Sequence, residues 1–392
     1  MIVQHGHMLS KEKIKPGETR PIASARILIV PDKFKGTLPA PEVCAAIAKG
    51  WRSVRATDRL DLLPMSDGGD GFGEVMGRLL KARLRPVRTL DAAHQPIRTH
   101  WWWEPDRKLA IIESAQVVGM ARLPAQQFHP FRLDTFGLGR VLNDAVRIGA
   151  EQCMIGVGGS ATNDGGFGLG RALGWKFLNR MGRELHEWWQ LSGLAHVRPP
   201  KNACQTGITV AVDVANPLLG PRGCSRVYGP QKGIRPEDLV LAEGCLRRLT
   251  LVLEQQLGID RAAAPGAGAA GGLGFGLMAF AGAKAQSGFE VFAQAAGLEE
   301  RVRRSDVVIT GEGAVDRQTH MGKGVGQVMR LCRKLKIPCI VLAGVASAPM
   351  RIGGHALQIQ ALTDIGTLDQ AKKQPAKHLE KLSGMVARMR IF

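Results

Sequence analysis

Acidic residues follow several short apolar runs of this 392-residue sequence, each within a few positions of the end of the run. Asp67 comes after "LDLLPM", Asp213 after "GITVAV", and Glu312 after "DVVIT". One such carboxylate is commonly a helix cap. A recurring set flanked by glycine is harder to explain by capping alone and indicates Mg²⁺ with a phosphorylated ligand. The other members are Asp32 with Lys33 and Lys35, Asp70, Glu113, Asn163 with Asp164, Asn216, and Asp316.

The stretch "GVGGSATNDGGFG" at residues 156–168 contains six glycines in thirteen positions. Backbone N–H groups of Gly158, Gly159 and Ser160 can approach an anion there, and Asp164 can meet a metal ion or a substrate hydroxyl. The alternative is a turn whose glycines only permit tight packing of a strand on a helix. Phosphoryl transfer needs metal or lysine charge and a carboxylate that orients the attacking hydroxyl, and this chain supplies both.

Neither of two common nucleotide-binding motifs is fully present in these loops. The P-loop pattern fails, because Gly322-Lys323 is followed by glycine rather than Ser or Thr. Residues 156–161 match the dinucleotide pattern G-x-G-x-x-G/A after an expected strand. The next expected strand, "WKFLN", lacks the acidic residue that would bind the ribose hydroxyls. A nicotinamide-dependent oxidoreductase therefore remains a weaker alternative.

The elements that position these loops alternate between strand and helix. "ARILIVPD", "LDLLPM", "SDVVITGEG", "IPCIVLAGV" and "HALQIQALTD" read as short buried strands separated by helical stretches. This alternation predicts βαβ units and a parallel sheet. We expect an α/β fold of two domains, in which a doubly wound domain from 26–90 and 286–392 carries an inserted α/β domain at 91–285. Residues 1–25 are expected to be a disordered extension.

The composition excludes several classes of protein. The formal charge is 53 − 34 = +19, but the basic residues are spread along the chain with few aromatic residues among them, so nucleic-acid binding is not expected. Residues 262–283 carry no charge, yet seven Gly and nine Ala make them too weakly apolar for a membrane span. Seven cysteines without a C-x-x-C pair favour reduced thiols and a cytoplasmic protein. The oligomeric state is left open, with a homodimer as one alternative.

Eight motifs, in this order, resemble those of the bacterial glycerate kinase family that makes 2-phosphoglycerate. They are "PDKFKGTLPAPEV", "SDGGDG", "IGVGGSATNDGG", "DVANPLLG", "YGPQKG", "PGAGAAGGLGFGL", "TGEGAVD" and "IGTLDQA". The resemblance runs from about Arg26 to the C-terminus. It implies transfer of the γ-phosphoryl of ATP, with Mg²⁺, to D-glycerate. It also implies a flavodoxin-like domain, an inserted domain, and an active-site cleft between them.

Residue roles follow from this resemblance as expectations. Lys35 or Lys232 should meet the carboxylate of glycerate, with Lys35 also placed among the catalytic residues. Asp213 and Asp316 should orient the attacking hydroxyl or bind the metal, and Asp67 and Asp164 should bind the metal or the substrate. The ATP-binding set is expected to be Gly158, Gly159, Ser160, Asn163, Glu312 and Lys323.

The chain also departs from the family pattern near the expected cleft. Ala314 stands where the family usually has Arg, and Met321 where it has His. Val325 and Gln327 replace a Pro and a Gly, Thr135 replaces Ser, and Arg140 replaces an acidic residue. An ATP-dependent kinase of a related small hydroxy acid is therefore a second alternative, and a non-catalytic relative a third.

Overall fold

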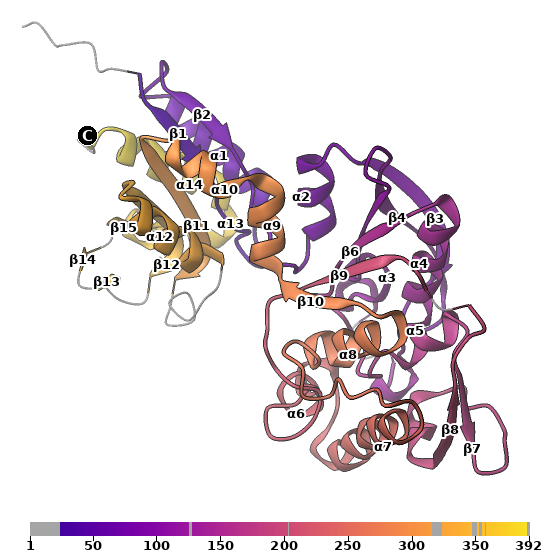
Figure 1. The fold of residues 1–392 in the computed structure, drawn as a ribbon. Coiled ribbons are helices and arrows are strands. Elements are labelled where there is room, and N and C mark those ends of the chain that lie inside the picture. The colour runs from indigo at the N-terminus through magenta and orange to yellow at the C-terminus, as the bar shows by residue number, and fades with distance from the viewer. Residues whose placement is uncertain are drawn as a thin grey trace, which may run out of the picture.

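The structure, a computed structural model, describes residues 24–124, 128–202, 204–315, 324–346, 351–352, 355–356 and 358–389. Two lobes, each built on one large sheet, make up the molecule (Figure 1). The predicted extension, residues 1–25, lies outside the described residues except for Ser24 and Ala25.

The first lobe contains a five-stranded, wholly parallel sheet in the order β15-β12-β11-β1-β2. Counted along the chain, this is the strand order 2-1-3-4-5 of flavodoxin-like folds. The strands are β1 (Arg26–Ile29), β2 (Arg59–Leu62), β11 (Val307–Val315), β12 (Cys339–Ala346) and β15 (Gln358–Ala361). Both ends of the chain therefore contribute strands to one sheet.

Helices cover both faces of this sheet. Successive side chains of a strand point to opposite faces, and here both sets are apolar. Ile27 and Ile29 pack against α1 (Ala40–Arg52) and α14 (Pro375–Ala387), whereas Leu28 packs on the side of α12 (Gly324–Leu335). The other helices of this lobe are α2 (Phe72–Leu79), α9 (Gly288–Ala296), α10 (Leu298–Arg303) and α13 (Leu368–Lys373). A short hairpin joins β13 (Arg351–Ile352) to β14 (His355–Ala356).

The second lobe contains a six-stranded mixed sheet in the order β10-β9-β6-β5-β4-β3. β5, β6, β9 and β10 run parallel, and β3 and β4 are antiparallel. The bounds are β3 (Arg83–Leu90), β4 (Pro96–Glu104), β5 (Leu109–Glu113), β6 (Gln152–Gly156), β9 (Gly207–Val212) and β10 (Lys284–Ser287). The hairpin of β7 (Lys176–Asn179) and β8 (Leu194–Arg198) lies apart from this sheet (Figure 1).

One face of the six-stranded sheet packs on α4 (Phe136–Ile148), α5 (Phe167–Ala172) and α8 (Ala269–Ala281). α3 (Ala115–Val118), α6 (Cys224–Tyr228) and α7 (Leu239–Leu257) complete this side. The other face shares an apolar core with the first lobe through α2 and α9. Gly73 and Gly77 of α2 lie against Trp102 of β4, where any added Cβ would overlap the indole ring.

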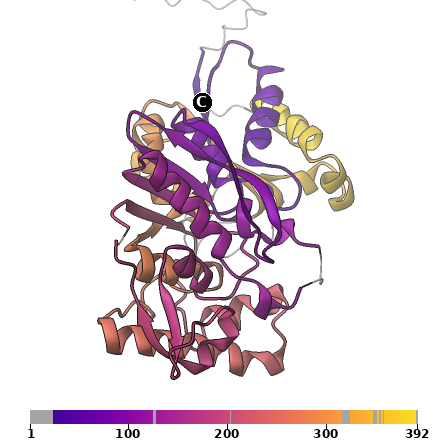
Figure 2. The ribbon, with the colours of Figure 1, turned by 90° about the vertical axis from the view of Figure 1, so that its right-hand side faces the viewer.

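This architecture confirms the predicted fold class, an α/β protein with a doubly wound parallel sheet and a second, mixed α/β unit. Figure 2 shows the two lobes from the side. The domain boundaries stay a prediction. Strand β3 pairs with β4, so a division that follows the sheets would fall between α2 and β3 rather than after Leu90.

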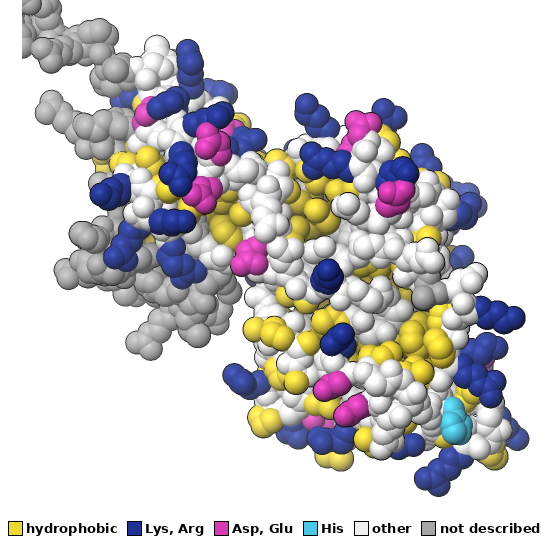
Figure 3. Space-filling model, in the orientation of Figure 1, with side chains coloured by type: hydrophobic (Ala, Val, Ile, Leu, Met, Phe, Trp, Pro, Cys, Tyr) yellow, Lys and Arg dark blue, Asp and Glu magenta, His cyan; other side chains and the backbone are white. Residues whose placement is uncertain are grey.

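Cationic side chains are scattered over both lobes (Figure 3), as the sequence pattern indicates. In the part of the chain that the structure describes, no helix is both long and apolar enough to cross a bilayer.

Candidate active site

A cleft of about 1160 Å³ lies where the carboxyl ends of the two sheets face each other. Loops after β1, β2, β5, β6 and β9 line it, together with the last residues of β11. Ligands of open α/β sheets bind at this end of the strands, because the helices that follow leave a crevice there. The predicted grouping of polar residues after successive strands is therefore present in three dimensions.

The first-lobe wall of the cleft carries Asp32, Lys33, Lys35 and Glu312. Asp32 lies just after β1, and Glu312 lies in the second half of the neighbouring strand β11. The strand order of the sheet reverses between these two strands. Burial, and then the nearby charge of Asp67, raise the pKa of Asp32 to about 7. The Lys33 ammonium donates a hydrogen bond of 2.9 Å to the carbonyl of Asp70, which ties this wall to the next loop.

Two glycine-rich loops form the floor of the cleft and pack backbone against backbone. A Cβ at Gly158 would lie 2.5 Å from the Cα of Gly69, and one at Gly159 would overlap the Asp70 carboxylate. Gly68, with φ of +97°, lies against the Ala211 carbonyl of β9. Tight packing therefore favours glycine at positions 158 and 159, although one loop packs on another here rather than a strand on a helix.

The same loop also presents donors to the cleft. The N–H groups of Gly158 and Ala161 bond to carbonyls of Gly68 and Val118. Those of Gly159 and Ser160 have no hydrogen-bond partner among the described residues, and both residues line the cleft. Two adjacent backbone donors of this kind can bind an anionic oxygen. Tight packing and ligand access thus coexist in three residues.

The second-lobe wall carries Asp213, Tyr228, Lys232 and Ala270. The Lys232 ammonium donates a hydrogen bond of 2.6 Å to the Thr162 carbonyl, and burial lowers the pKa of this lysine to about 8. Burial and then the charge of Asp213 raise the pKa of Tyr228, and its hydroxyl donates to Asn216 Oδ1 at 2.8 Å. The carboxylate of Asp213 can bind a hydroxyl group, and the ammonium of Lys232 can bind an anion.

Ala270 has a backbone conformation that alanine rarely adopts. It begins a run of three left-handed residues, with φ of +54°, followed by +70° at Gly271 and +85° at Gly272. A Cβ at Gly271 would lie 2.7 Å from Asn163 Cα and 2.8 Å from Lys232 Nζ. Such strain persists where packing on all sides imposes it, and it is common at functional sites.

Glu113, at the end of β5, lies under the rim of the cleft. Its two carboxylate oxygens accept hydrogen bonds from the N–H groups of Gly71 and Gly73, at 3.0 and 2.9 Å. Burial raises the pKa of Glu113. Glu113 therefore acts as a cap for the first turn of α2, the role that a single carboxylate after a strand most often has.

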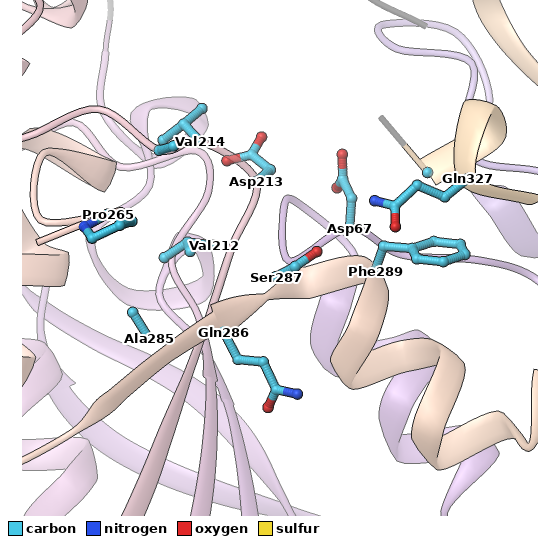
Figure 4. Close-up of a pocket in the computed structure, with 12 residues that line it drawn as sticks. Asp67, Val212, Asp213, Val214, Pro265, Ala285, Gln286, Ser287, Phe289 and Gln327 are labelled. Atoms are coloured by element: carbon cyan, nitrogen blue, oxygen red, sulfur yellow. The ribbon is translucent and has the colours of Figure 1, made fainter. Parts of the chain in front are cut away.

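A second pocket of about 260 Å³ adjoins the cleft and shares Asp67 and Asp213 with it. Figure 4 shows the two carboxylates on opposite sides of its mouth, with Val212 and Pro265 on one wall and Phe289 and Gln327 on the other. The sequence departure at Gln327 therefore lies at the site.

Comparison with known proteins now adds to this geometry. Residues 27–390 match the model of the glycerate kinase family. The chain belongs to this family. The glycerate kinase of Halalkalibacterium halodurans is 36% identical over 368 residues, which cover 92% of this chain and 97% of that protein. The glycerate 2-kinase of Escherichia coli K12 is 36% identical, with 88% and 93% covered. The family resemblance of the motifs is confirmed.

A solved structure of the same family shows the same architecture. The crystal structure assigned as glycerate kinase 2 from Salmonella typhimurium LT2 superposes with a TM-score of 0.79. The two chains are 33% identical, and the match covers 93% of this chain and 97% of that one.

The structure brings most of the predicted glycerate kinase site together. Eight of those residues line the cleft: Lys35, Asp67, Gly158, Gly159, Ser160, Asp213, Lys232 and Glu312. Asp316, Met321 and Lys323 lie outside the described residues. The individual roles stay predictions.

Asn163 and Asp164 do not line the cleft and are fully buried. Asn163 donates a hydrogen bond to Ser225 Oγ at 2.9 Å. Asp164 accepts bonds from the N–H groups of Thr135, Gly166 and Gly168. The geometry of Asp164 supports capping rather than the predicted metal or substrate contact.

Asp32, Lys33 and Asp70 lie in the polar loops that the sequence predicts and line the cleft, but the predicted set of site residues does not include them. Arg122 and Tyr228 also line the cleft without having been predicted as site residues; Arg122 ends a short 3-10 helix, and Tyr228, the first residue of the "YGPQKG" motif, ends α6. The position of Asp32 directly after the first strand was the available signal, since that strand lies beside the reversal of strand order.

The cleft fits Mg²⁺ in the manner of kinases. No cluster of three His, Cys, Asp or Glu side chains that could hold a metal occurs among the described residues. Mg²⁺ commonly takes only one or two carboxylates, with phosphate oxygens and water completing its shell. Asp32 and Asp67 follow the neighbouring strands β1 and β2 and repel each other, and a divalent cation bound by both would relieve that repulsion.

Proposed function

We propose that this protein transfers the γ-phosphoryl of ATP to D-glycerate, giving 2-phosphoglycerate and ADP. The observation that carries the proposal is the cleft itself, where carboxylates and lysines of both lobes face each other at the carboxyl ends of two sheets in a member of the glycerate kinase family. The choice of the 2-hydroxyl is supported by the name of the Escherichia coli relative, a glycerate 2-kinase.

Lys232 is proposed to bind the carboxylate of D-glycerate. Its ammonium is charged below pH of about 8 and is fixed by the Thr162 carbonyl, so little side-chain freedom is lost when the anion binds. Charge-assisted hydrogen bonds of this kind are about twice as strong as neutral ones. Asp213 lies exposed on the same wall, where its carboxylate can orient the acceptor hydroxyl and accept its proton.

Lys33, Lys35 and the N–H groups of Gly159 and Ser160 are proposed to bind the phosphate groups. They lie on the first wall and the floor of the cleft, facing the wall that carries Lys232. Asp32 and Asp67 would hold Mg²⁺, whose charge neutralises the phosphate oxygens during transfer. The chain's own residues then act by position and charge, which is most of what phosphoryl transfer requires of a protein.

We also propose a cytoplasmic location, which free cysteines would suit. All seven cysteines are free thiols, and none of them forms a disulfide.

Identification of the product tests the proposal. The purified protein would be incubated with D-glycerate and Mg-ATP, followed by enolase, pyruvate kinase and lactate dehydrogenase in the presence of ADP and NADH. NADH loss that depends on enolase but not on phosphoglycerate mutase would establish the 2-phosphorylated product. NADH loss only when the mutase is added would mean that the 3-hydroxyl is the acceptor. No ADP formation from D-glycerate, but turnover with another small hydroxy acid, would refute the substrate.

A further inference from the structure

Asp164 occupies a sealed position beneath the floor of the cleft. Its side chain is fully buried, and one of its oxygens accepts three hydrogen bonds. These come from the N–H and hydroxyl of Thr135, at 3.0 and 2.7 Å, and from the N–H of Gly168 at 2.9 Å. The other oxygen accepts from the N–H of Gly166 at 3.2 Å.

These bonds fasten the cleft loop to two helices. The Thr135 hydroxyl, which donates to Asp164, accepts a bond of 2.9 Å from the N–H of Leu169 in α5, and Thr135 itself precedes α4. The first N–H groups of a helix have no partner within the helix, so a buried carboxylate there satisfies groups that would otherwise be unpaired. Asp164 therefore fixes the lower end of the 156–168 loop.

A short series of contacts connects this anchor to the cleft. Thr162, two residues before Asp164, donates its N–H to Ser160 Oγ at 3.1 Å, and the two hydroxyls lie 2.8 Å apart. The carbonyl of Thr162 accepts the bond from Lys232. Gly271 closes the far side, since its carbonyl accepts from the Gly165 N–H at 3.1 Å and no Cβ would fit there.

The buried charge of Asp164 also bears on Lys232. The titratable groups that face Lys232 are Cys224 of α6 and Asp164, and the carboxylate of Asp164 favours the charged ammonium. Asp164 in turn faces Asp134, which precedes α4, and burial followed by that like charge raises its pKa to about 6. Near neutral pH Asp164 is thus mostly ionised and opposes the cost of burying the ammonium.

We propose that Asp164 is a positioning residue: it touches neither reactant, holds the loop that carries Gly159 and Ser160, and supplies the counter-charge that keeps Lys232 cationic. The proposal rests on the proposed function in taking Lys232 as the group that binds the substrate carboxylate. It assigns to Asp164 a role at the same site that is neither metal binding nor substrate contact.

The test compares two buried aspartates changed in the same way, Asp164→Asn and Asp58→Asn. Asp58 is the control, because it is buried in the first lobe and does not line the cleft; it accepts bonds from Ala25 N and Trp51 Nε1, at 3.0 and 2.9 Å, and also forms an ion pair with Arg55. Both variants should lower the midpoint of thermal unfolding. Only Asp164→Asn should raise the KM for D-glycerate tenfold or more and shift the basic limb of kcat/KM to lower pH by about one unit.

A second measurement does not depend on activity. In reductively ¹³C-methylated protein, the NMR titration of Lys232, assigned with Lys232→Arg, should show its pKa lowered in Asp164→Asn and unchanged in Asp58→Asn. If D-glycerate is not a substrate, the proposed function fails, and this titration still decides the role of Asp164. An unchanged Lys232 titration in Asp164→Asn would overturn the proposal, as would equal effects of the two variants on KM.

A pair of milder variants covers the case in which Asp164→Asn does not fold. Thr135→Val keeps the shape of the side chain but removes the hydroxyl, whereas Thr135→Ser keeps the hydroxyl. The first should raise the KM for D-glycerate at least threefold and the second should leave it near the wild-type value. Equal KM values for the two variants would mean that the Thr135–Asp164 bond does not position the site.

Discussion

Asp213 and Asp164 follow neighbouring parallel strands, β9 and β6, and both were predicted to bind a metal ion. Asp213 lies exposed at the mouth shared by the cleft and its side pocket. Asp164 is fully buried, and its two carboxylate oxygens accept four hydrogen bonds, from Thr135, Gly166 and Gly168. The same residue type, after neighbouring strands, is thus open to ligands in one loop and bonded within the fold in the other. The difference between them is access to the cleft.

The largest expected effect separates these two carboxylates by activity. Asp213→Asn should lower kcat by about 10²–10⁴-fold, the usual contribution of a group that orients and deprotonates a reacting hydroxyl. Because the side chain is exposed, the midpoint of thermal unfolding should stay close to wild type. Steady-state kinetics and a thermal melt measure both quantities. A large loss of thermal stability with normal kcat would place Asp213 with Asp164.

The next effect tests the buried side of the comparison. Gly166 has φ of +75°, and an added Cβ would lie 2.5 Å from the Cα of Gly276. Gly166→Ala should lower the free energy of unfolding by about 3 kcal/mol, from the left-handed backbone and the overpacking together. Urea denaturation measures the change. A loss under about 1 kcal/mol would show that α5 and α8 can move apart.

A third effect concerns pH. Lys232 loses its proton as pH rises through about 8, whereas an ordinary lysine stays charged to above pH 10. On the basic side, the kcat/KM for D-glycerate should therefore fall about tenfold for each pH unit above about 8. In the pH profile of kcat, the basic limb should lie at higher pH than in the profile of kcat/KM, because the bound substrate carboxylate stabilises the ammonium. A flat profile up to pH 9.5 would exclude Lys232 as the carboxylate-binding group.

The smallest effect is a control for backbone strain alone. Gly149, at the end of α4, has φ of +103° but no atom within 4 Å of an added Cβ. Gly149→Ala should cost about 1 kcal/mol of unfolding free energy, from conformation only. Kinetic constants should not change. If it cost as much as Gly166→Ala, crowding could not be the reason that Gly166 is sensitive.

Local patterns predicted the fold because its strands are short, buried and bounded by turns. Ile27, Leu28 and Ile29 are all buried since helices cover both faces of the sheet, and such runs are typical of parallel strands. The antiparallel pairing of β3 with β4 was not predicted. Its outer strand is mostly exposed and carries Arg83, Arg85 and Pro86, so it lacks the apolar alternation by which a strand is recognised.

The site was predicted less completely for a different reason. The sequence places a carboxylate after a strand but does not show which way the loop turns there. Glu113 turns under α2, Asp164 turns inward between α4 and α5, and Asp213 turns outward. Those directions depend on contacts with Gly71, Thr135 and other residues distant in sequence, so they emerge only when the whole chain is folded.

The strand order of the first lobe has a consequence for synthesis on the ribosome. β1 and β2 leave the exit tunnel early, but the strand that pairs with the other side of β1 begins at Val307, about 280 positions later. All six strands of the second sheet, from Arg83 to Ser287, emerge in between. The second lobe can therefore fold while the first lobe consists only of β1, β2 and their helices. The pairing of β1 with β11 comes late, because it closes a long loop. Chains arrested when residue 287 has just left the tunnel should resist proteolysis over 83–287 and remain sensitive before residue 63.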